Sequence, residues 1–314
     1  MQNEKMLSVV VPIFSEASVI NEFYSRIKGM FDSLKNKIKY EIIFVNDGSR
    51  DDSLNLLKAL NKKDSSIKII NFSRNFGHQI AITAGIDRAK GDCIVTMDGD
   101  LQDPPEVIPE MIEKWNTGYK VVYGVRKKRK GEGAFKIITA NVFYRILNLM
   151  SNLKIPVDSG DFRLMDREVV DRLKTLKEGN RYVRGLVAWL GFPRIGVYYE
   201  RDPRYAGKPK YSIRNSLRLS LNGITSFSEK PLNFSSYAGY LIVLSSFTFA
   251  LWLIASKMAN PGFVIEGWVP IIVVVLFLGG VQLISIGILG QYVARIYSEV
   301  RCRPLYIVQE ETGF

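Results

Sequence analysis

Two carboxylates and a carboxamide lie close together in residues 97–105, where Asp98 and Asp100 are followed by Gln102. This stretch follows the apolar run 93–97, which predicts a buried strand. In open α/β sheets, ligands bind beyond the carboxyl ends of the strands. Hard oxygen ligands suit Mg²⁺ or Mn²⁺, which keep coordination sites for phosphate groups. The pattern therefore predicts a metal bound to a diphosphate, with a simple Asp-Gly turn as the alternative.

Further apolar segments alternate with segments of helical period along the first 125 residues. The expected strands are 7–14, 41–45, 67–72, 93–97 and 121–125. Strands that are apolar on both faces favour a parallel sheet covered by helices on both sides. Each strand is followed by polar residues, which would then meet at one edge of the sheet. This convergence favours a functional site over a turn.

The chain has 314 residues and a formal charge of +12, and its hydrophobicity is unevenly distributed. No charged residue occurs between Pro231 and Lys257 or between Gly267 and Ala294, and each run exceeds the roughly 20 apolar residues that span a bilayer. We therefore expect transmembrane helices over 231–257 and 267–294. The helical spacing of apolar residues before the first span predicts an interfacial amphipathic helix over 212–230.

The remaining boundaries follow from these spans. Residues 1–211 form the expected catalytic domain, 258–266 an extracytoplasmic loop and 295–314 a cytoplasmic tail. No signal peptide is expected, because the first residues lead directly into a strand-like run. Arginine and lysine flank the spans on the side of both termini, so the positive-inside rule predicts a multi-pass plasma membrane protein with its domain and both termini in the cytoplasm.

Composition also limits the classes of binding partner that we expect for this protein. Cys93 and Cys302 show no disulfide or zinc spacing. With two spans present, membrane lipid and phosphate-bearing substrates explain the positive charge more simply than nucleic acid does. The spans lack ionisable side chains other than tyrosine, which argues against a transport pathway. Glycines at 279–280, 287 and 290 would permit close helix approach and hence a homo-oligomer.

Five motifs, in order, resemble the signature of family 2 glycosyltransferases. They are residues 11–16, 45–49, 73–77, 97–105 and 158–163. The resemblance is greatest to the branch that makes polyprenyl-phosphate sugars, similar to bactoprenol glucosyltransferases and dolichyl-phosphate mannose synthases. It implies a GT-A fold with a Rossmann-like, mainly parallel sheet, a nucleotide-sugar donor and a divalent metal.

The resemblance also assigns the donor and metal residues. Those implied to bind the donor are Pro12, Phe14, Glu16, Asp47 and Asp98, and those implied to contact Mg²⁺ or Mn²⁺ are Asp98, Asp100 and Gln102. Strand-end packing is the alternative for Pro12 and Phe14, and a turn carboxylate is the alternative for Asp47. The metal would act as a Lewis acid on the departing diphosphate.

A lipid monophosphate acceptor changes what the enzyme must supply. Its second pKa would be about 6, so the attacking oxygen is largely unprotonated and the main need is positive charge. The basic residues expected to bind the acceptor phosphate are Arg126, Arg201, Arg204, Lys208 and Lys210. Pro209 stands where the family commonly has serine, whereas residues 127–130 can also be explained as a solvated charge run.

The position that the family marks as catalytic is Asp161, with Asp158 as a neighbouring candidate and Arg163 as a charge partner. Given the acidity of the acceptor, Asp161 is interpreted as an orienting or weakly basic carboxylate. A pure ion pair with Arg163 is the alternative. His78 is the only histidine, and we leave it outside the predicted site.

The sequence thus predicts an inverting, metal-dependent hexosyltransferase that acts on polyprenyl (undecaprenyl) phosphate, with UDP-glucose favoured by the resemblance. UDP-N-acetylhexosamine, UDP-galactose, GDP-mannose and a diacylglycerol acceptor remain open. An inactive membrane protein that binds nucleotide sugars is the rival from another class. A dinucleotide-binding dehydrogenase is disfavoured because the first strand lacks a Gly-x-Gly-x-x-Gly turn.

Overall fold

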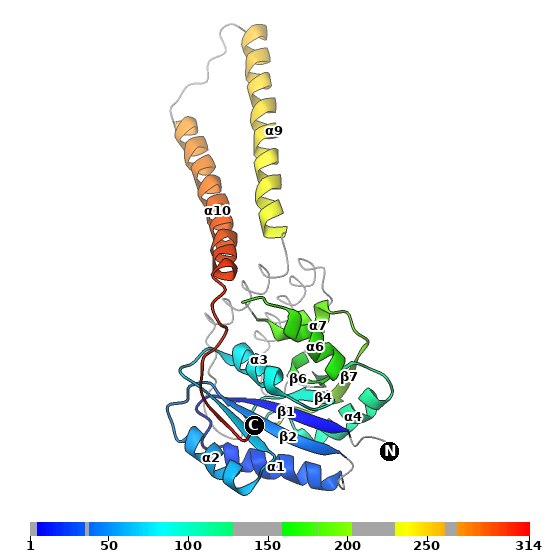
Figure 1. Ribbon diagram of the computed structural model, residues 1–314. Coiled ribbons are helices and arrows are strands. Elements are labelled where there is room, and N and C mark those ends of the chain that lie inside the picture. Colours follow the sequence, from blue (N-terminus) through cyan, green and yellow to red (C-terminus); the bar gives the residue numbers. More distant parts are fainter. Residues whose placement is uncertain (1–4, 35–37, 128–158, 180, 203–229, 261–268) are drawn as a thin grey trace. The chain divides into compact units, whose positions relative to one another are not determined.

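The computed structural model describes residues 5–34, 38–127, 159–179, 181–202, 230–260 and 269–314 (Figure 1). These residues form two compact units. The first contains the described residues up to Asp202 together with 303–314, and the second contains 230–260 and 269–302. The predicted interfacial helix 212–230 lies almost entirely outside the described residues, as do most of the loop 258–266 and the site candidates Asp158, Arg204, Lys208 and Lys210.

The described part of the first unit is built on one eight-stranded sheet, with strand order β7-β5-β6-β4-β1-β2-β3-β8. The strands are β1 Met6–Ile13, β2 Lys39–Asn46, β3 Ile67–Phe72, β4 Cys93–Thr96, β5 Val121–Arg126, β6 Ser159–Asp166, β7 Arg194–Tyr199 and β8 Val308–Thr312. The pairs β1–β2, β2–β3, β1–β4 and β5–β7 are parallel, whereas β6 is antiparallel to β4 and β5, and β8 is antiparallel to β3.

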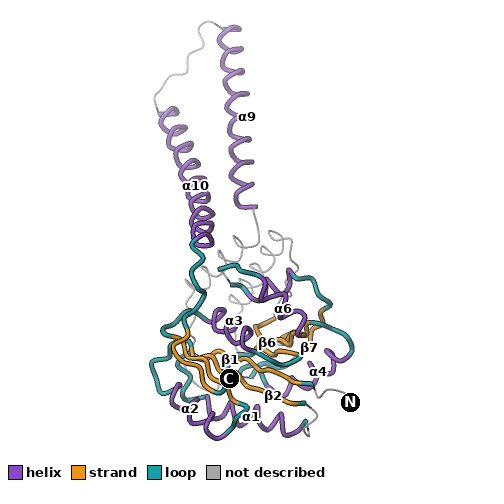
Figure 2. Tube along the Cα trace, viewed as in Figure 1, coloured by secondary structure: helices purple, strands orange, loops and turns teal. Residues whose placement is uncertain are grey.

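Helices cover both faces of this sheet, as Figure 2 shows. On one face lie α1 Ile20–Ser33, α2 Ser53–Lys63, the short 3-10 helix η1 Pro105–Val107 and α4 Ile108–Asn116; on the other lie α3 His78–Arg88, α6 Arg167–Thr175 and α7 Val183–Trp189. The alternation along β1 explains the arrangement, because Val9 and Val11 belong to the core under α1 while Val10 lies against Gly85 of α3. A Cβ at Gly85 would meet Val10 Cγ1 at 2.2 Å, so this helix requires glycine to lie close to the sheet.

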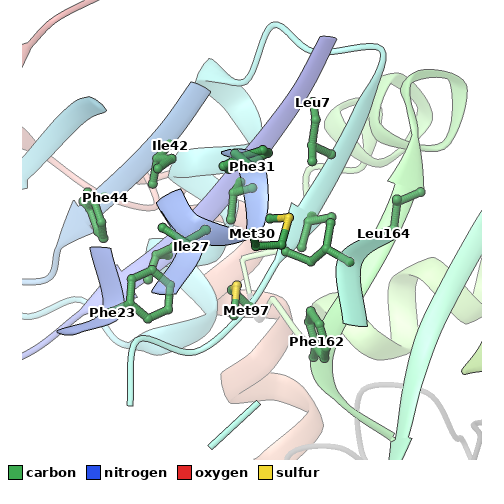
Figure 3. Close-up of a cluster of buried hydrophobic side chains, with 14 of the residues drawn as sticks. Leu7, Phe23, Ile27, Met30, Phe31, Ile42, Phe44, Met97, Phe162 and Leu164 are labelled. Atoms are coloured by element: carbon green, nitrogen blue, oxygen red, sulfur yellow. The ribbon is translucent and has the colours of Figure 1, made fainter. Parts of the chain in front are cut away.

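The main core lies between the sheet and α1, and Figure 3 shows its large side chains. Phe23 and Ile27 of α1 point toward Phe44 of β2, and Phe162 and Leu164 extend the same cluster along β6. All five side chains are fully buried. Because β6 contributes alternate residues to this core, its intervening residues Asp161 and Arg163 lie on the opposite face, toward α3.

The second unit consists, in its described part, of α9 Lys230–Ala259 and α10 Val269–Val300, which contact each other. The segments Leu232–Ala259 and Ile271–Val300 are long and apolar enough to cross a membrane, and their hydrophobic windows are not buried. These two helices correspond to the predicted spans.

The sheet contains three strands that the sequence analysis did not anticipate, β6, β7 and β8, of which β6 and β8 bear most on the site. Strand β6 follows residues outside the described part and runs against its neighbours, so its beginning, not its end, reaches the edge where β4 ends. Strand β8 lies in the segment predicted only as a tail, yet it extends the sheet beyond β3. Both strands bring side chains to the edge predicted to be functional.

Candidate active site

The carboxyl ends of the parallel strands meet at one edge of the sheet, as the sequence predicted. Phe14, Asp47, Ser73 and Asp98 lie just beyond β1, β2, β3 and β4, and Arg126 ends β5. The beginning of the antiparallel strand β6 supplies Asp161 to the same edge. Chain segments far apart in sequence thus contribute polar side chains to a common rim.

A pocket of about 670 Å³ opens at the β1, β2 and β3 side of this rim. Its lining comes from the ends of β2 and β3, from the loops after these strands and β1, from α2 and from the C-terminal strand: Phe14, Asn46, Gly48, Ser49, Arg50, Leu54, Asn71, Phe72, Ser73, Arg74, Asn75 and Gln309. Phe14 is 38% exposed, in keeping with a side chain available for stacking. Pro12 is instead buried within β1, paired in register with Val45, and Glu16 is partly buried at the turn that leads into α1.

Asp47 is buried at this rim, and its carboxylate is hydrogen-bonded to the loop after β3. Its carboxylate accepts hydrogen bonds from the backbone nitrogens of Phe76 and Gly77 and from Asn75 Nδ2 at 2.6 to 3.0 Å. Burial raises the pKa of Asp47, while these donors favour its ionised form. Asp47 therefore holds the loop that carries His78 into position, whether or not it also contacts a base.

The backbone at position 48 can accommodate only glycine. Its φ is 68°, and a Cβ there would lie 2.5 Å from the backbone of Arg74 and Asn75. The two loops that line the pocket can approach this closely only because residue 48 has no side chain.

The motif after β4 is joined to β6 by the histidine that begins α3. His78 Nε2 lies 3.2 Å from Asp98 Oδ1 and 3.4 Å from Asp161 Oδ2. Burial lowers the pKa of His78, but the two carboxylates outweigh it and hold this pKa well above its usual range. A charged imidazolium therefore separates two carboxylates that would otherwise repel each other.

Asp161 is surrounded by donors and cations. Its Oδ2 accepts a 2.8 Å hydrogen bond from Gln79 Nε2, and its Oδ1 lies 3.3 Å from the Arg184 guanidinium and 3.8 Å from that of Arg163. Burial opposes ionisation, but Arg184 and His78 hold the pKa of Asp161 well below its usual range. The predicted ion pair with Arg163 is thus present, although Arg184 is the nearer partner.

A second charged cluster lies around Asp103, whose side chain is fully buried. Tyr199 at the end of β7 donates a hydrogen bond to its Oδ1, and the side chains of Arg126 and Arg201 lie 3.8 and 3.9 Å from the same oxygen. Gly160 leaves room for this arrangement, because a Cβ there would lie 2.8 Å from the Arg126 guanidinium. Burial raises the pKa of Asp103 to about 6. The two described arginines predicted to bind the acceptor are therefore brought together.

The described donors fit a hard divalent cation with few protein ligands. Asp98 and Asp100 offer carboxylate oxygens, and the buried Asp98 Oδ1 has no hydrogen-bond partner among the described residues beyond its ion-pair contact with His78. No group of three or more His, Cys, Asp or Glu side chains suited to a metal occurs in the described ranges. Mg²⁺ or Mn²⁺ held by one or two carboxylates takes its other ligands from phosphates and water, so this sparse set is compatible with such an ion.

Five residues of these clusters were missed or set aside in the sequence analysis: His78, Gln79, Asp103, Arg184 and Tyr199. Asp103 was part of the quoted motif, and His78 directly followed another motif, so proximity in sequence could have indicated both. Arg184 and Tyr199 lie on α7 and β7, beyond the last motif, and only the tertiary fold brings them near Asp161 and Asp103.

Comparison with known proteins identifies the family to which this site belongs. Residues 8–174, which contain all five motifs, most of β1 and the strands β2 to β6, match the profile of Glycosyl transferase family 2. The chain belongs to this family. The GT-A-like fold that the resemblance implied is thereby confirmed, and the chain is a glycosyltransferase.

Several family 2 relatives match almost the whole chain. An uncharacterized glycosyltransferase, YkcC, from Bacillus subtilis is 52% identical over 306 residues, covering 98% of this chain and 94% of its own length. The uncharacterized glycosyltransferase sll0501 from Synechocystis is 44% identical and covers 98% and 96%. A prophage-derived bactoprenol glucosyl transferase from Shigella flexneri is 42% identical and covers 97% of both chains. The similarity therefore includes both apolar helices.

Proposed function

We propose that this glycosyltransferase moves glucose from UDP-glucose to a polyprenyl phosphate, with inversion at the sugar carbon C1, at the cytoplasmic face of a membrane. The observation that carries the proposal is the meeting, at one sheet edge, of a nucleoside-sized pocket, the Asp98–Asp100 motif and the paired side chains of Arg126 and Arg201. The relatives named bactoprenol glucosyl transferases support the sugar and the acceptor class.

On the donor side, the nucleoside occupies the pocket beside Phe14, and the diphosphate extends toward Asp98 and Asp100. Asp98, Asp100 and Gln102 would hold a divalent cation, which when bound would act as a Lewis acid on the departing diphosphate. Asp98 is kept ionised for this role, because the charge of His78 outweighs the effect of burial and lowers the pKa of Asp98.

On the acceptor side, an oxygen of the lipid phosphate attacks C1 as the bond from C1 to the diphosphate breaks, and the electron pair of that bond leaves with UDP. The attacking oxygen is already ionised, so no proton has to be removed. Arg126 and Arg201 hold the acceptor phosphate, together with the basic residues 204, 208 and 210. Positive charge here lets two anionic reactants approach each other.

Asp161 acts as an orienting carboxylate. Its oxygens face Gln79, Arg184 and Arg163, and its depressed pKa makes it a weak base and a weak nucleophile. A covalent sugar intermediate on such a group is disfavoured. Direct displacement by the phosphate therefore follows, and a single displacement inverts the configuration at C1.

The membrane arrangement is supported by the sheet itself. Strand β8 follows α10 in the sequence, yet it pairs with β3, which precedes α9. Partners in one sheet lie on the same side of a membrane, so the chain between them crosses an even number of times. Two spans, α9 and α10, satisfy this condition, and the flanking basic residues favour the cytoplasm for the domain and both termini.

The proposed function is tested with purified full-length protein, Mg²⁺ or Mn²⁺, and radiolabelled nucleotide sugars. We expect label from UDP-glucose to enter the lipid extract with undecaprenyl phosphate but not with diacylglycerol. Faster transfer from GDP-mannose or UDP-N-acetylglucosamine than from UDP-glucose would refute the assigned sugar. Transfer to diacylglycerol alone would refute the assigned acceptor.

Replacing His78 with glutamine is expected to lower kcat about 10- to 100-fold, comparable to the loss of a group that supports metal ligands. Glutamine can still hydrogen-bond to one carboxylate, but it cannot neutralise the repulsion between Asp98 and Asp161. Steady-state kinetics at saturating metal measures the effect. A His78→Gln variant with the wild-type kcat would show that the imidazolium contributes only to packing.

A further inference from the structure

We propose that Gln309 reads the edge of the donor's nucleobase, so that the C-terminal strand completes a pocket built otherwise by the N-terminal half of the domain. This inference rests on the proposed use of a nucleotide sugar. Gln309 is the one residue of the pocket lining, within the described part of the chain, that comes from beyond both apolar helices.

The pairing of β8 with β3 shows why this side chain reaches the pocket. Asn71 pairs with Glu310, but Phe72 pairs with Val308, so the register skips Gln309. An extra residue of this kind forms a β-bulge, which redirects a side chain and is common beside active sites. Both strand partners at the bulge, Asn71 and Phe72, also line the pocket.

The strand is fixed on both faces of the sheet next to the bulge. Glu310 forms a 2.7 Å ion pair with Lys58 of α2, and Glu311 forms a 2.8 Å ion pair with Arg88 of α3. The two helices lie on opposite faces, so these contacts fix the register of β8 from both sides. Gln309 is thus placed by its neighbours while its own side chain remains exposed to the pocket.

The segment before the bulge supports the same pocket wall. Tyr306 stacks on Phe72 with ring centroids 5.2 Å apart and donates a 2.9 Å hydrogen bond to Asp87, and Ser73 N donates to Ile307 O at 3.1 Å. Phe72 and Ser73 are pocket residues. The C-terminal segment therefore both shapes the wall and contributes a polar group to it.

The chemistry of the group matches a base edge. A carboxamide presents two N–H donors and a carbonyl acceptor, and it carries no charge. A nucleobase edge likewise presents donors and acceptors in one plane. Arg50 and Arg74 line the same pocket and suit phosphate or ribose better than a neutral base. Of the other carboxamides in the lining, Asn46 donates a hydrogen bond to Asn71 and Asn75 donates one to Asp47. Gln309 is therefore the carboxamide of this wall best suited to discriminate between bases.

The test is calorimetric titration of full-length Gln309→Ala and Gln309→Glu with UDP and GDP, in the absence of acceptor. We expect Gln309→Ala to weaken UDP binding about three- to tenfold, the loss of one hydrogen bond between neutral groups, and to narrow the preference for UDP over GDP. Gln309→Glu, which keeps the acceptor but loses the donor, should also weaken UDP binding. The KM for polyprenyl phosphate should not change.

Glu113→Gln is the control, because Glu113 is an exposed residue of α4 that is not part of the pocket lining and does not contact β8. It should bind UDP with wild-type affinity. Wild-type UDP affinity in Gln309→Ala, or equal weakening in Glu113→Gln, would overturn the proposal. If the wild-type protein binds UDP but forms no hexosyl lipid, the proposed reaction is refuted. Recognition of the nucleobase by Gln309 would not be affected by that result.

Discussion

Replacing Asp161 with asparagine is expected to lower kcat about 10²-fold, the loss that misplacement of a reacting group by about 1 Å can cause. The variant removes the negative charge on which Arg184, Arg163 and His78 converge. These cations would then repel one another in a buried site, and the sugar would lose its orienting carboxylate. KM for the nucleotide sugar should change much less than kcat, because Asp161 is not part of the pocket lining.

Asp171→Asn is a suitable control for this experiment. Asp171 belongs to the same segment of chain, is largely exposed and pairs only weakly with Arg167 across one helical turn. Its replacement should leave kcat unchanged. If Asp161→Asn retains wild-type kcat while calorimetry shows intact UDP binding, Asp161 has no part in transfer, and the ion pairs around it serve stability alone.

Replacing Asp100 with alanine, or removing divalent cations with EDTA, is expected to lower kcat by at least about 10²-fold. A metal that supplies several kcal/mol of charge stabilisation to the transition state accounts for a loss of this size. Asp100 is buried directly after β4, and its Oδ1 accepts a hydrogen bond from the backbone nitrogen of Gln102 at 3.2 Å. The variant thus removes a proposed metal ligand and also loosens the turn that carries another proposed ligand, Gln102.

Metal titration distinguishes these two effects. Asp100→Ala should need a higher concentration of Mg²⁺ or Mn²⁺ for half-maximal activity. Asp92→Asn, at the opposite end of β4, should respond to metal as the wild type does, since Asp92 accepts a hydrogen bond from Met6 at the far edge of the sheet. Full activity in EDTA, or an unchanged metal requirement in Asp100→Ala, would contradict a metal at this motif.

The sequence predicted the parallel core of the sheet because apolar runs such as 41–45 and 67–72 need burial on both faces, whichever chain segments cover them. It also predicted that polar residues would meet at the carboxyl edge, since this follows from parallel pairing alone. The position of Asp161 was available only from the family motif. Its route to the edge depends on the antiparallel direction of β6, which no periodicity reveals.

Other features depend on contacts between distant segments. Residues 308–312 are polar and short, so they resemble a tail in sequence, and their strand conformation comes from pairing with β3. His78 appeared to be a loop histidine without a partner, because both of its partners come from distant parts of the chain: Asp98 follows β4 and Asp161 lies on β6. The roles assigned to Lys208 and its neighbours remain predictions, because they lie outside the described residues.

The central claim is that one hexose, without phosphate, moves from the nucleotide sugar to a polyprenyl phosphate. Mass spectrometry of the lipid formed from UDP-glucose and undecaprenyl phosphate tests this most directly. The account predicts undecaprenyl monophosphate carrying one hexose, with one UDP released for each lipid formed. A diphosphate-linked sugar with release of UMP, or a glucosylated lipid without phosphate, would contradict it.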